Sequence, residues 1–311
     1  MGRIIVIGGA NIDICGTSLT SLRDYDSNPG TIAVSFGGVG RNIAENCVLL
    51  DQQVDFVTVF SHDSYGRMLK ADCESLGMNC SYSTVTENYP SSMYLAILDH
   101  DHDMKIAMSD MRILREFTPE MLERVLKTVS GDDIIIIDAN LDMECIEYIA
   151  AHAPCRIAAD PVSTAKAKRF EGILDRITIF KPNRYEAEEM TGIRIEDIPS
   201  GIKALEWYLG RGVSEVLLSL AEDGILLAAE GKMYHFSHRR VDVQNATGGG
   251  DALLGAYVSE RRNGKAPAEA ARFAAAAALT VIERQGVKRR EISRKMIEEN
   301  AVSTEIKEKI L

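Results

Sequence analysis

Short, continuous apolar runs alternate with amphipathic segments along most of the chain. The runs are rich in Ile, Val, Leu and Ala, and polar residues follow most of them; four cover residues 3–9, 54–60, 132–140 and 214–224. The segments between them place apolar side chains at helical spacing, as in residues 118–129. Continuous apolar strands separated by helices predict a three-layer α/β fold, in which helices cover both faces of a doubly wound, mostly parallel sheet.

Two stretches, residues 12–36 and 79–109, lack helical periodicity and alternate like strands. Both leave the α/β pattern early in the chain, so we expect them to form one small β-layer that projects over the main strand ends as a lid. No repeat or low-complexity linker divides the rest, which predicts a single domain over residues 1–311 with this lid. Unpaired edges of the lid strands favour a homodimer through the lid.

Three glycines, Gly248, Gly249 and Gly250, come directly before an apolar helical segment that opens with Asp251. Ligands of open α/β sheets bind beyond the carboxyl ends of the strands, where this loop is expected. The first N–H groups of a helix have no partner within the helix, and glycine lets an anion approach them closely. Asp251 is either a helix-capping residue or a general base beside an anion hole, and the motif alone leaves both interpretations open.

The composition excludes several classes of protein. The 311 residues carry a formal net charge of −11 without a Lys/Arg block, so a nucleic-acid-binding surface is not expected, and an anionic ligand such as ATP would need a local positive site. No apolar stretch reaches the length of a membrane span. The six cysteines show no C-x-x-C pairing and the N-terminus lacks a signal-peptide pattern, so we expect reduced thiols and a cytoplasmic location.

Two motifs carry a resemblance to a known family. They are SFGGVGRNIAEN at residues 35–46 and TGGGDALLGAY at residues 247–257. With this pair the chain resembles the ribokinase-like (PfkB-type) carbohydrate kinase family over essentially its whole length, although Gly249 stands where the family usually has alanine. The stretches GGANIDI, DPVSTAKAKR and KPNRYEAEEM add a particular similarity to the pseudouridine kinases of that family.

The resemblance implies a ribokinase-like fold and an ATP- and Mg²⁺-dependent kinase that phosphorylates the 5′-hydroxyl of pseudouridine to give pseudouridine 5′-phosphate. Two alternatives stay open. In the first, the chain is another sugar or nucleoside kinase of the family that acts on ribose, a different nucleoside or a hexose. In the second, it is a non-catalytic regulator that binds a nucleoside or sugar. Asn245 occupies the place where the family often has an acidic residue, which argues against activation by K⁺.

For the phosphoryl group, the resemblance assigns the catalytic base to Asp251 and the anion hole to the three glycines before it. Asn183 and Glu186 form an N-x-x-E motif, which in the family organises Mg²⁺; an ordinary helix N-terminus explains the same pattern. The residues assigned to ATP and its phosphates are Asn183, Ser219, Gly224, Gly248 and Gly250.

For the acceptor, the resemblance selects polar residues and glycines at predicted strand ends. A carboxylate and an amide can hold vicinal hydroxyls by several hydrogen bonds. The residues assigned to the acceptor are Asn11, Asp13, Gly37, Gly38, Asn42, Asn140 and Lys166. A strand-to-helix turn at Gly37 and Gly38 and a surface lysine at position 166 are the competing interpretations.

Two further segments are interpreted without a ligand. LDHDHDMK, residues 98–105, resembles a metal cluster, but it joins two alternating runs and is expected to be a hairpin turn of the lid. The acidic segment 298–310 is expected to be a solvated helix face.

Overall fold

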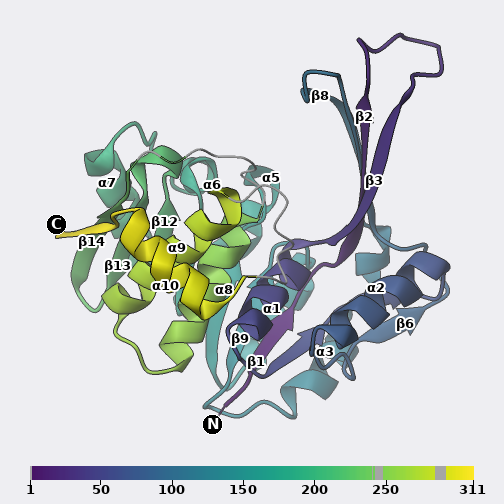
Figure 1. Ribbon diagram of the computed structural model, residues 1–311. Coiled ribbons are helices and arrows are strands. Elements are labelled where there is room, and N and C mark those ends of the chain that lie inside the picture. The colour runs from purple at the N-terminus through teal and green to yellow at the C-terminus, as the bar shows by residue number, and fades with distance from the viewer. Residues whose placement is uncertain (1, 240, 242–247, 284–291) are drawn as a thin grey trace.

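The computed structural model describes residues 2–239, 241, 248–283 and 292–311. Within this part of the chain, a nine-stranded sheet has the order β15-β14-β13-β12-β11-β10-β9-β1-β4. Its strands are β1 (Ile4–Ile7), β4 (Val54–Val57), β9 (Ile134–Asp138), β10 (Arg156–Asp160), β11 (Ile179–Phe180), β12 (Glu215–Ser219), β13 (Ile225–Ala229), β14 (Lys232–Ser237) and β15 (Lys307–Ile310). Neighbours from β4 to β12 are parallel, which confirms the predicted mostly parallel sheet (Figure 1). Beyond β12, β13 to β15 continue the sheet in antiparallel pairs.

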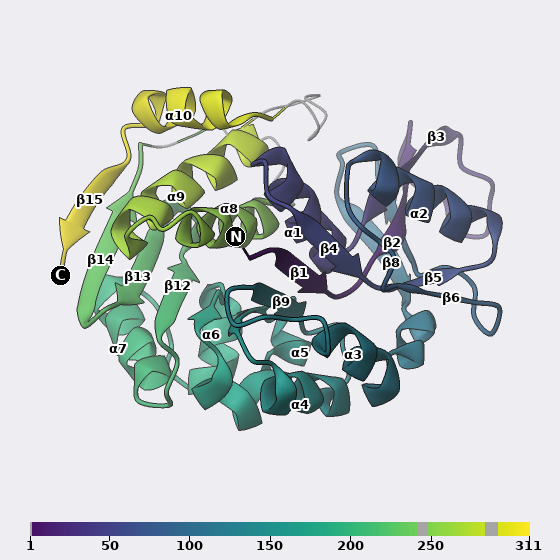
Figure 2. The same ribbon diagram turned by 90° about the horizontal axis from the view of Figure 1, so that it is seen from below.

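Helices cover both faces of this sheet (Figure 2). One face carries α1 (Val39–Leu49), α8 (Gly249–Arg262), α9 (Pro267–Glu283) and α10 (Arg294–Ser303). The other carries α3 (Pro119–Leu126), α4 (Met143–His152), α5 (Thr164–Ala167), α6 (Arg184–Thr191) and α7 (Ile198–Leu209), with the 3-10 helices η1 (Arg112–Glu116) and η2 (Lys168–Arg176). A further helix, α2 (Ser64–Ser75), lies beside β5 (Val59–Ser61), and a third 3-10 turn, η3 (Ala221–Asp223), joins β12 to β13. The layers are those that the sequence predicts.

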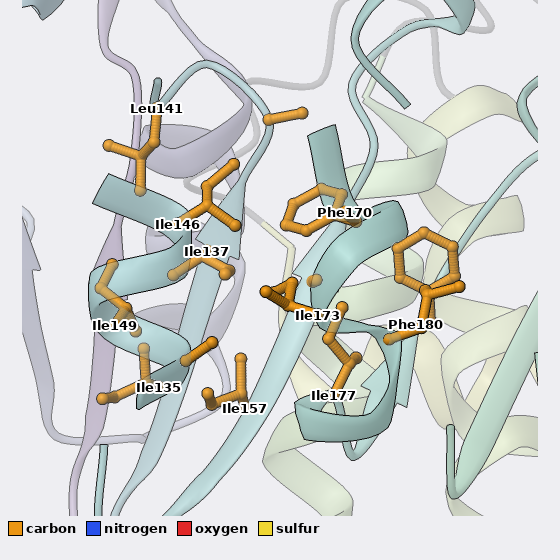
Figure 3. Packing of buried hydrophobic residues seen from close by; sticks show 14 of the residues in the cluster. Ile135, Ile137, Leu141, Ile146, Ile149, Ile157, Phe170, Ile173, Ile177 and Phe180 are labelled. Carbon is orange, nitrogen blue, oxygen red and sulfur yellow. The ribbon is translucent and has the colours of Figure 1, made fainter. Parts of the chain in front are cut away.

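The central strands are apolar on both faces. Successive strand residues point to opposite sides of a sheet. Ile135 and Ile137 of β9 belong to the same apolar cluster as Ile146 of α4 (Figure 3), whereas Ile134 and Ile136 belong to the cluster on the other face. All five side chains are fully buried. A strand that is buried on both sides therefore appears in the sequence as an unbroken apolar run, which explains why its position could be predicted.

A second sheet of four strands has the order β3-β2-β7-β8. Its strands are β2 (Asn11–Ser18), β3 (Gly30–Gly37), β7 (Met93–Leu98) and β8 (Met104–Asp110). It takes up much of the stretches 12–36 and 79–109, but β6 (Thr84–Thr86) pairs with β5 instead. The second sheet projects from the α/β body as a long ribbon (Figure 1).

The two acidic segments differ in how well they match expectation. Residues 98–105 contain the β7–β8 hairpin turn, in which Asp99 N donates to Asp103 O over 2.9 Å. The described residues include no group of three or more His, Cys, Asp or Glu side chains that could hold a metal ion. Segment 298–310 is only partly helical, because Lys307–Ile310 forms the edge strand β15. All four of these residues are exposed, and charged side chains on an edge strand leave no apolar alternation to detect.

Candidate active site

Polar residues that follow the parallel strands meet at one edge of the nine-stranded sheet. The strands β1, β9, β10, β11 and β12 run in the same direction, so their carboxyl ends lie side by side. The predicted site residues at or just beyond these ends are Asn11, Asn140, Lys166, Asn183 and Ser219. The start of α8 reaches the same edge, since Gly250 packs close to the side chain of Lys181, the residue that follows β11.

The glycine run forms the first turn of α8. Gly248 is the N-cap residue, with a φ of 85° that favours glycine, and it offers no side chain to cap the helix. A Cβ on Gly249 would lie 2.8 Å from Cγ2 of Ile282, and a Cβ on Gly250 would lie 3.2 Å from Nζ of Lys181. Backbone conformation and close packing therefore both favour glycine here, and the N-cap residue leaves the first N–H groups of the helix uncovered.

Asp251 faces the first turn of α1. It is the third residue of α8 and is 8% exposed. Its Oδ2 accepts a hydrogen bond of 2.8 Å from Nδ2 of Asn42, which lies in the first turn of α1. Because Gly248 holds the N-cap position, the capping interpretation does not describe the place of Asp251. Asn42 follows Gly38, the N-cap residue of α1, whose φ of 100° also favours glycine.

Lys181 is a functional candidate that the sequence analysis missed. It follows β11, is 4% exposed, and places Nζ 3.2 Å from Oδ2 of Asp160. Burial acts to lower the pKa of Lys181, but the negative charges of Asp160, Glu186 and Asp251 outweigh it and raise that pKa. A fixed ammonium group therefore lies between the start of α6 and the start of α8. The available signal was a lysine that directly follows a buried strand, two residues before the N-x-x-E motif.

Asn183 and Glu186 form a capping box at the start of α6. The side chain of Asn183 accepts from Glu186 N over 2.9 Å, and Glu186 Oε2 accepts from Asn183 N over 2.8 Å. The helix-start interpretation of the N-x-x-E motif is thus what the structure shows. Glu186 is 3% exposed, and this burial raises the pKa of its carboxyl group, although the positive charge of Lys181 acts to lower it. Its Oε1 forms no hydrogen bond with the residues that the structure describes.

Ser219 and Gly224, two of the residues assigned to ATP, lie at the same end of β12. Ser219 ends this strand and bridges in parallel to Asn183. Gly224 lies in the turn to β13 with a φ of 85°, and a Cβ there would lie 2.1 Å from the carbonyl oxygen of Phe236. Ser219 therefore lies next to the capping box of α6, whereas the tight turn is sufficient to explain why glycine occupies position 224. Asn245 lies outside the described residues.

Asn11, Asp13 and Gly37 are adjacent in the second sheet. Asn11 pairs with Gly37 across β2 and β3, and Asn11 Nδ2 donates to Asp13 Oδ1. A Cβ on Gly37 would lie 2.0 Å from Oδ2 of Asp13, so glycine is the residue that leaves room for this carboxylate. A Cβ on Gly38 would lie 2.5 Å from the carbonyl oxygen of Gly9. The early glycine pair thus serves both a strand-to-helix turn and the packing of Asp13.

Asn140 and Lys166 meet beside a cavity of about 290 Å³. Lys166 Nζ donates to Asn140 Oδ1 over 2.7 Å, so Lys166 is held in place rather than extended into solvent. Burial lowers the pKa of Lys166 below its ordinary value, and Lys166 forms no ion pair with a described residue. The cavity has polar and apolar surface in similar shares, and its lining residues are Met111, Arg112, Leu114, Arg115, Asn140, Asp142, Lys166 and Arg169.

A comparison with models of protein families shows to which family the chain belongs. The model of the pfkB family of carbohydrate kinases matches residues 1–292. The chain belongs to the pfkB carbohydrate kinase family. This family places it among the phosphotransferases that use an alcohol group as acceptor, and kinases of the ribokinase type use ATP, usually with Mg²⁺. The predicted family is confirmed, and so is the ribokinase-like fold, because the structure of a ribokinase from Thermotoga maritima matches with a TM-score of 0.84 and 24% identity over 96% of this chain and 99% of its own.

Individual relatives agree with the family. A pseudouridine kinase of Escherichia coli is 33% identical over 275 residues, covering 87% of each chain. A guanosine-inosine kinase of Exiguobacterium acetylicum is 28% identical over 295 residues, covering 91% of this chain and 95% of its own. The structure of a carbohydrate kinase from Agrobacterium tumefaciens is similar over the full length of both chains, with a TM-score of 0.87 and 25% identity. These relatives agree that the chain is a sugar or nucleoside kinase of the pfkB family. None of the helices that the structure describes is both long and apolar enough to cross a membrane.

Proposed function

We propose that the chain is an ATP-dependent pseudouridine kinase that produces pseudouridine 5′-phosphate. One observation carries the kinase chemistry: the Asp251 carboxylate lies in the glycine-rich first turn of α8 and accepts a hydrogen bond from Asn42, a predicted acceptor residue in the first turn of α1. The base is therefore next to both the anion hole and the acceptor residues. The choice of pseudouridine is supported by the relative from Escherichia coli and by the cavity beside Asn140 and Lys166.

In this proposal Asp251 accepts the proton of the acceptor hydroxyl. The hydroxyl oxygen forms a bond to the γ-phosphorus of ATP, and the bond between that phosphorus and the β–γ bridging oxygen breaks, so ADP leaves. The N–H groups after Gly248 stabilise the charge on the transferring group, because phosphoryl transfer depends mainly on positioning and charge stabilisation. Lys181 adds a fixed positive charge beside Gly250.

The residues present fit a sparsely coordinated Mg²⁺. This ion retains several waters and needs only one or two carboxylates besides the substrate phosphates. Glu186 would hold it through Oε1, since the capping box uses only Oε2, and Asn183 would orient its waters. When bound, Mg²⁺ would neutralise part of the phosphate charge.

The acceptor residues fit the two halves of a nucleoside. Asn11 and Asp13 offer amide and carboxylate groups to the ribosyl hydroxyls. Asn140 and Lys166 offer N–H donors to the carbonyl oxygens of a uracil ring, and a cavity of about 290 Å³ lies beside them. Free ribose would leave this cavity without a ligand, which favours a riboside as the acceptor.

A riboside panel tests the proposal. The purified protein is incubated with Mg-ATP and, separately, pseudouridine, uridine, inosine, guanosine, ribose and fructose, and products are detected by mass spectrometry. Uridine is the matched control, because it differs from pseudouridine only in how the ring joins the sugar. We expect the highest kcat/KM with pseudouridine. A higher kcat/KM with another acceptor would show that this acceptor, and not pseudouridine, is the preferred substrate. Binding of a riboside without any phosphorylated product would favour the non-catalytic regulator.

We further propose that the second sheet is a lid over the acceptor and that two copies pair through it. One face of this sheet carries Asp13; the opposite face is apolar across all four strands. Residues on that face include Ile14, Ile32, Val34, Leu95, Ile97, Ile106 and Met108. Four of them are largely exposed, from 50% for Val34 to 77% for Ile32. An apolar face of this extent favours a partner of the same shape.

A further inference from the structure

Asp138 joins three separate chain segments through a single carboxylate. It is the last residue of β9 and is 1% exposed. Its Oδ2 accepts from Gly9 N over 3.0 Å, from Gly40 N over 2.8 Å and from Asn140 Nδ2 over 3.0 Å. Its Oδ1 accepts from Asn140 N over 2.9 Å. Both oxygens are thus surrounded by N–H donors, which is the environment of a carboxylate that acts only as an acceptor.

Glycines make this convergence possible. A Cβ on Gly8 would lie 2.6 Å from Asp138 Oδ2, and a Cβ on Gly9 would lie 2.9 Å from Asn140 Nδ2. A Cβ on Gly40 would lie 2.9 Å from the backbone of Gly8. These distances are shorter than side chains tolerate, so the end of β1 and the start of α1 reach the carboxylate only as bare backbone.

Each segment that Asp138 holds leads directly to a predicted acceptor residue. Gly9 comes two residues before Asn11, and Gly40 comes two residues before Asn42, the partner of Asp251. The third segment contains Asn140 itself, whose Oδ1 accepts from Lys166. One carboxylate therefore connects the sugar side, the catalytic base and the proposed nucleobase side of the acceptor site.

We propose that Asp138 is a positioning residue that sets the relative places of the three acceptor-binding segments without touching the acceptor. This inference rests on the proposed kinase function. It predicts that loss of the carboxylate weakens acceptor recognition while ATP recognition, which belongs to α6, α8 and the end of β12, changes little.

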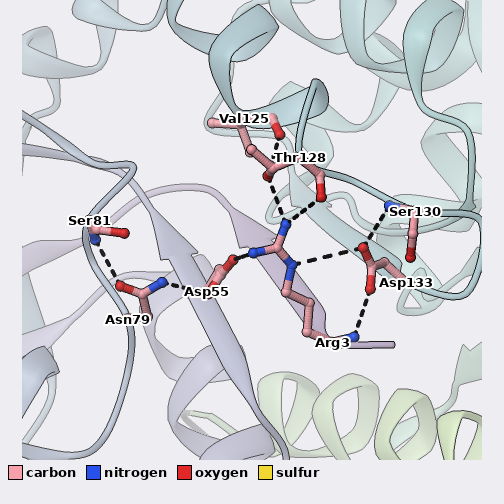
Figure 4. A network of polar contacts seen from close by, with 8 residues as sticks. All are labelled: Arg3, Asp55, Asn79, Ser81, Val125, Thr128, Ser130 and Asp133. Carbon is pink, nitrogen blue, oxygen red and sulfur yellow. Dashed lines mark hydrogen bonds and ion pairs between the residues drawn. The ribbon is translucent and has the colours of Figure 1, made fainter. Parts of the chain in front are cut away.

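Asp133 provides a matched control at the opposite end of the same strand. It directly precedes β9, is 4% exposed, and accepts from Arg3 N and Ser130 N, each over 2.8 Å. Figure 4 shows this network around Arg3. Both carboxylates thus bind backbone N–H groups next to β1, but Asp133 lies at the edge of the sheet that is remote from the site. A merely structural role would give Asp138 and Asp133 the same consequences.

The test compares Asp138→Asn with Asp133→Asn. Asparagine keeps one acceptor oxygen and places an NH₂ group where the other oxygen accepted N–H bonds. We expect both variants to melt at a lower temperature in circular dichroism. Only Asp138→Asn should raise the KM of the acceptor that the wild type phosphorylates, by about tenfold, the change expected from an unsatisfied buried donor. The KM for ATP should stay within about twofold in both variants.

The outcomes separate the inference from the proposed function. Equal acceptor KM values in the two variants, or an equal rise in the KM for ATP and for the acceptor in Asp138→Asn, would overturn the positioning role. A wild type that phosphorylates no riboside or sugar would instead overturn the kinase proposal. If Asp138→Asn does not fold, Gly8→Ala takes its place, because the added methyl displaces the carboxylate without removing it. It should raise the acceptor KM in the same way.

Discussion

The Asp251 carboxylate and the Asn42 amide meet over 2.8 Å although 209 residues separate them. Asn42 comes from α1, which follows β3, and Asp251 comes from α8, whose first turn contains the glycine run. The hydrogen bond fixes the direction of the carboxylate before any ligand arrives. Preorganisation of this kind reduces the cost of orienting a base in the transition state.

The first prediction concerns this base. Asp251→Asn should lower kcat by about 10²-fold or more, because the amide cannot accept the proton of the acceptor hydroxyl. Binding of the acceptor should remain measurable by isothermal titration calorimetry, since Asn11 and Asp13 are unchanged. Glu269→Gln, an exposed change on α9, serves as the control and should leave kcat unaffected. A near-normal kcat in Asp251→Asn would remove Asp251 from the role of base.

The second prediction concerns the buried ion pair of Lys181 and Asp160, in which Nζ and Oδ2 are 3.2 Å apart. Lys181→Met leaves a buried carboxylate without its cation, which should lower the free energy of unfolding by about 3–5 kcal/mol. In Lys181→Met/Asp160→Asn the loss should be smaller, because the carboxylate that formed the ion pair with Lys181 is then also replaced by a neutral group. Urea unfolding of the wild type, both single variants and the double variant measures the coupling. Additive effects in the double variant would contradict this account.

The sequence allowed part of the site to be predicted at this scale. Asp251 and Asn42 stand in motifs, and the structure brings them into contact. Lys181 stands in no motif that the sequence analysis used as a site, and the N–H groups of Gly9 and Gly40 that Asp138 binds are not apparent from the residues around it. Their importance depends on which strand ends are neighbours and on which N–H groups point inward, and neither follows from residue order alone. The roles of all these residues in turnover stay predictions.

Among the elements, strands buried on both faces were predictable, and elements held by polar contacts were less so. Ile134 to Ile137 form an unbroken apolar run because each side of β9 faces an apolar layer. The edge strand β15 has no such pattern, and Thr84–Thr86 pairs with β5 rather than with the second sheet. Short strands at edges are defined by their partners, which the local sequence does not contain.

The third prediction concerns the connection between α2 and the second sheet. Asp63 caps α2 by accepting from Gly66 N over 2.7 Å, and it accepts from Ser91 N over 2.8 Å, just before β7. Burial acts to raise the pKa of Asp63, but the hydrogen bonds from Ser91 and Gly66 outweigh it and lower the pKa. A lowered folded-state pKa means that this stabilisation is present above the unfolded value of about 3.9 and is lost as the pH falls through the folded value.

Asp63→Asn should therefore lower the free energy of unfolding at pH 7 by about 1 kcal/mol, the usual effect of a weakened helix cap. Below about pH 4 the difference from the wild type should shrink, because the wild-type carboxyl group then becomes protonated as well. Urea unfolding at pH 7 and at the lowest pH where both proteins are folded measures the two differences. A difference that is constant with pH would show that the charge of Asp63 contributes nothing.

For the whole molecule, the arrangement of the two sheets relates catalysis to assembly. The nine-stranded sheet supplies the residues at its strand ends, and the second sheet brings Asn11 and Asp13 to the same region through β2. Because Asp13 lies on one face of the second sheet, a partner on the apolar face would leave the acceptor side accessible. Proposed lid and proposed dimer are therefore compatible uses of opposite faces of the same four strands.

The last prediction tests that assembly. Ile32 and Met108 lie on the apolar face in the two edge strands, β3 and β8, and are 77% and 64% exposed. We expect the wild type to be a dimer in light scattering coupled to size-exclusion chromatography. Ile32→Lys/Met108→Lys should be a monomer with an unchanged circular dichroism spectrum, since both side chains contribute little to the core of a single chain. Val302→Lys, equally exposed but on α10, is the control and should stay dimeric. A monomeric wild type, or a double variant that remains dimeric, would show that this face does not hold two copies together.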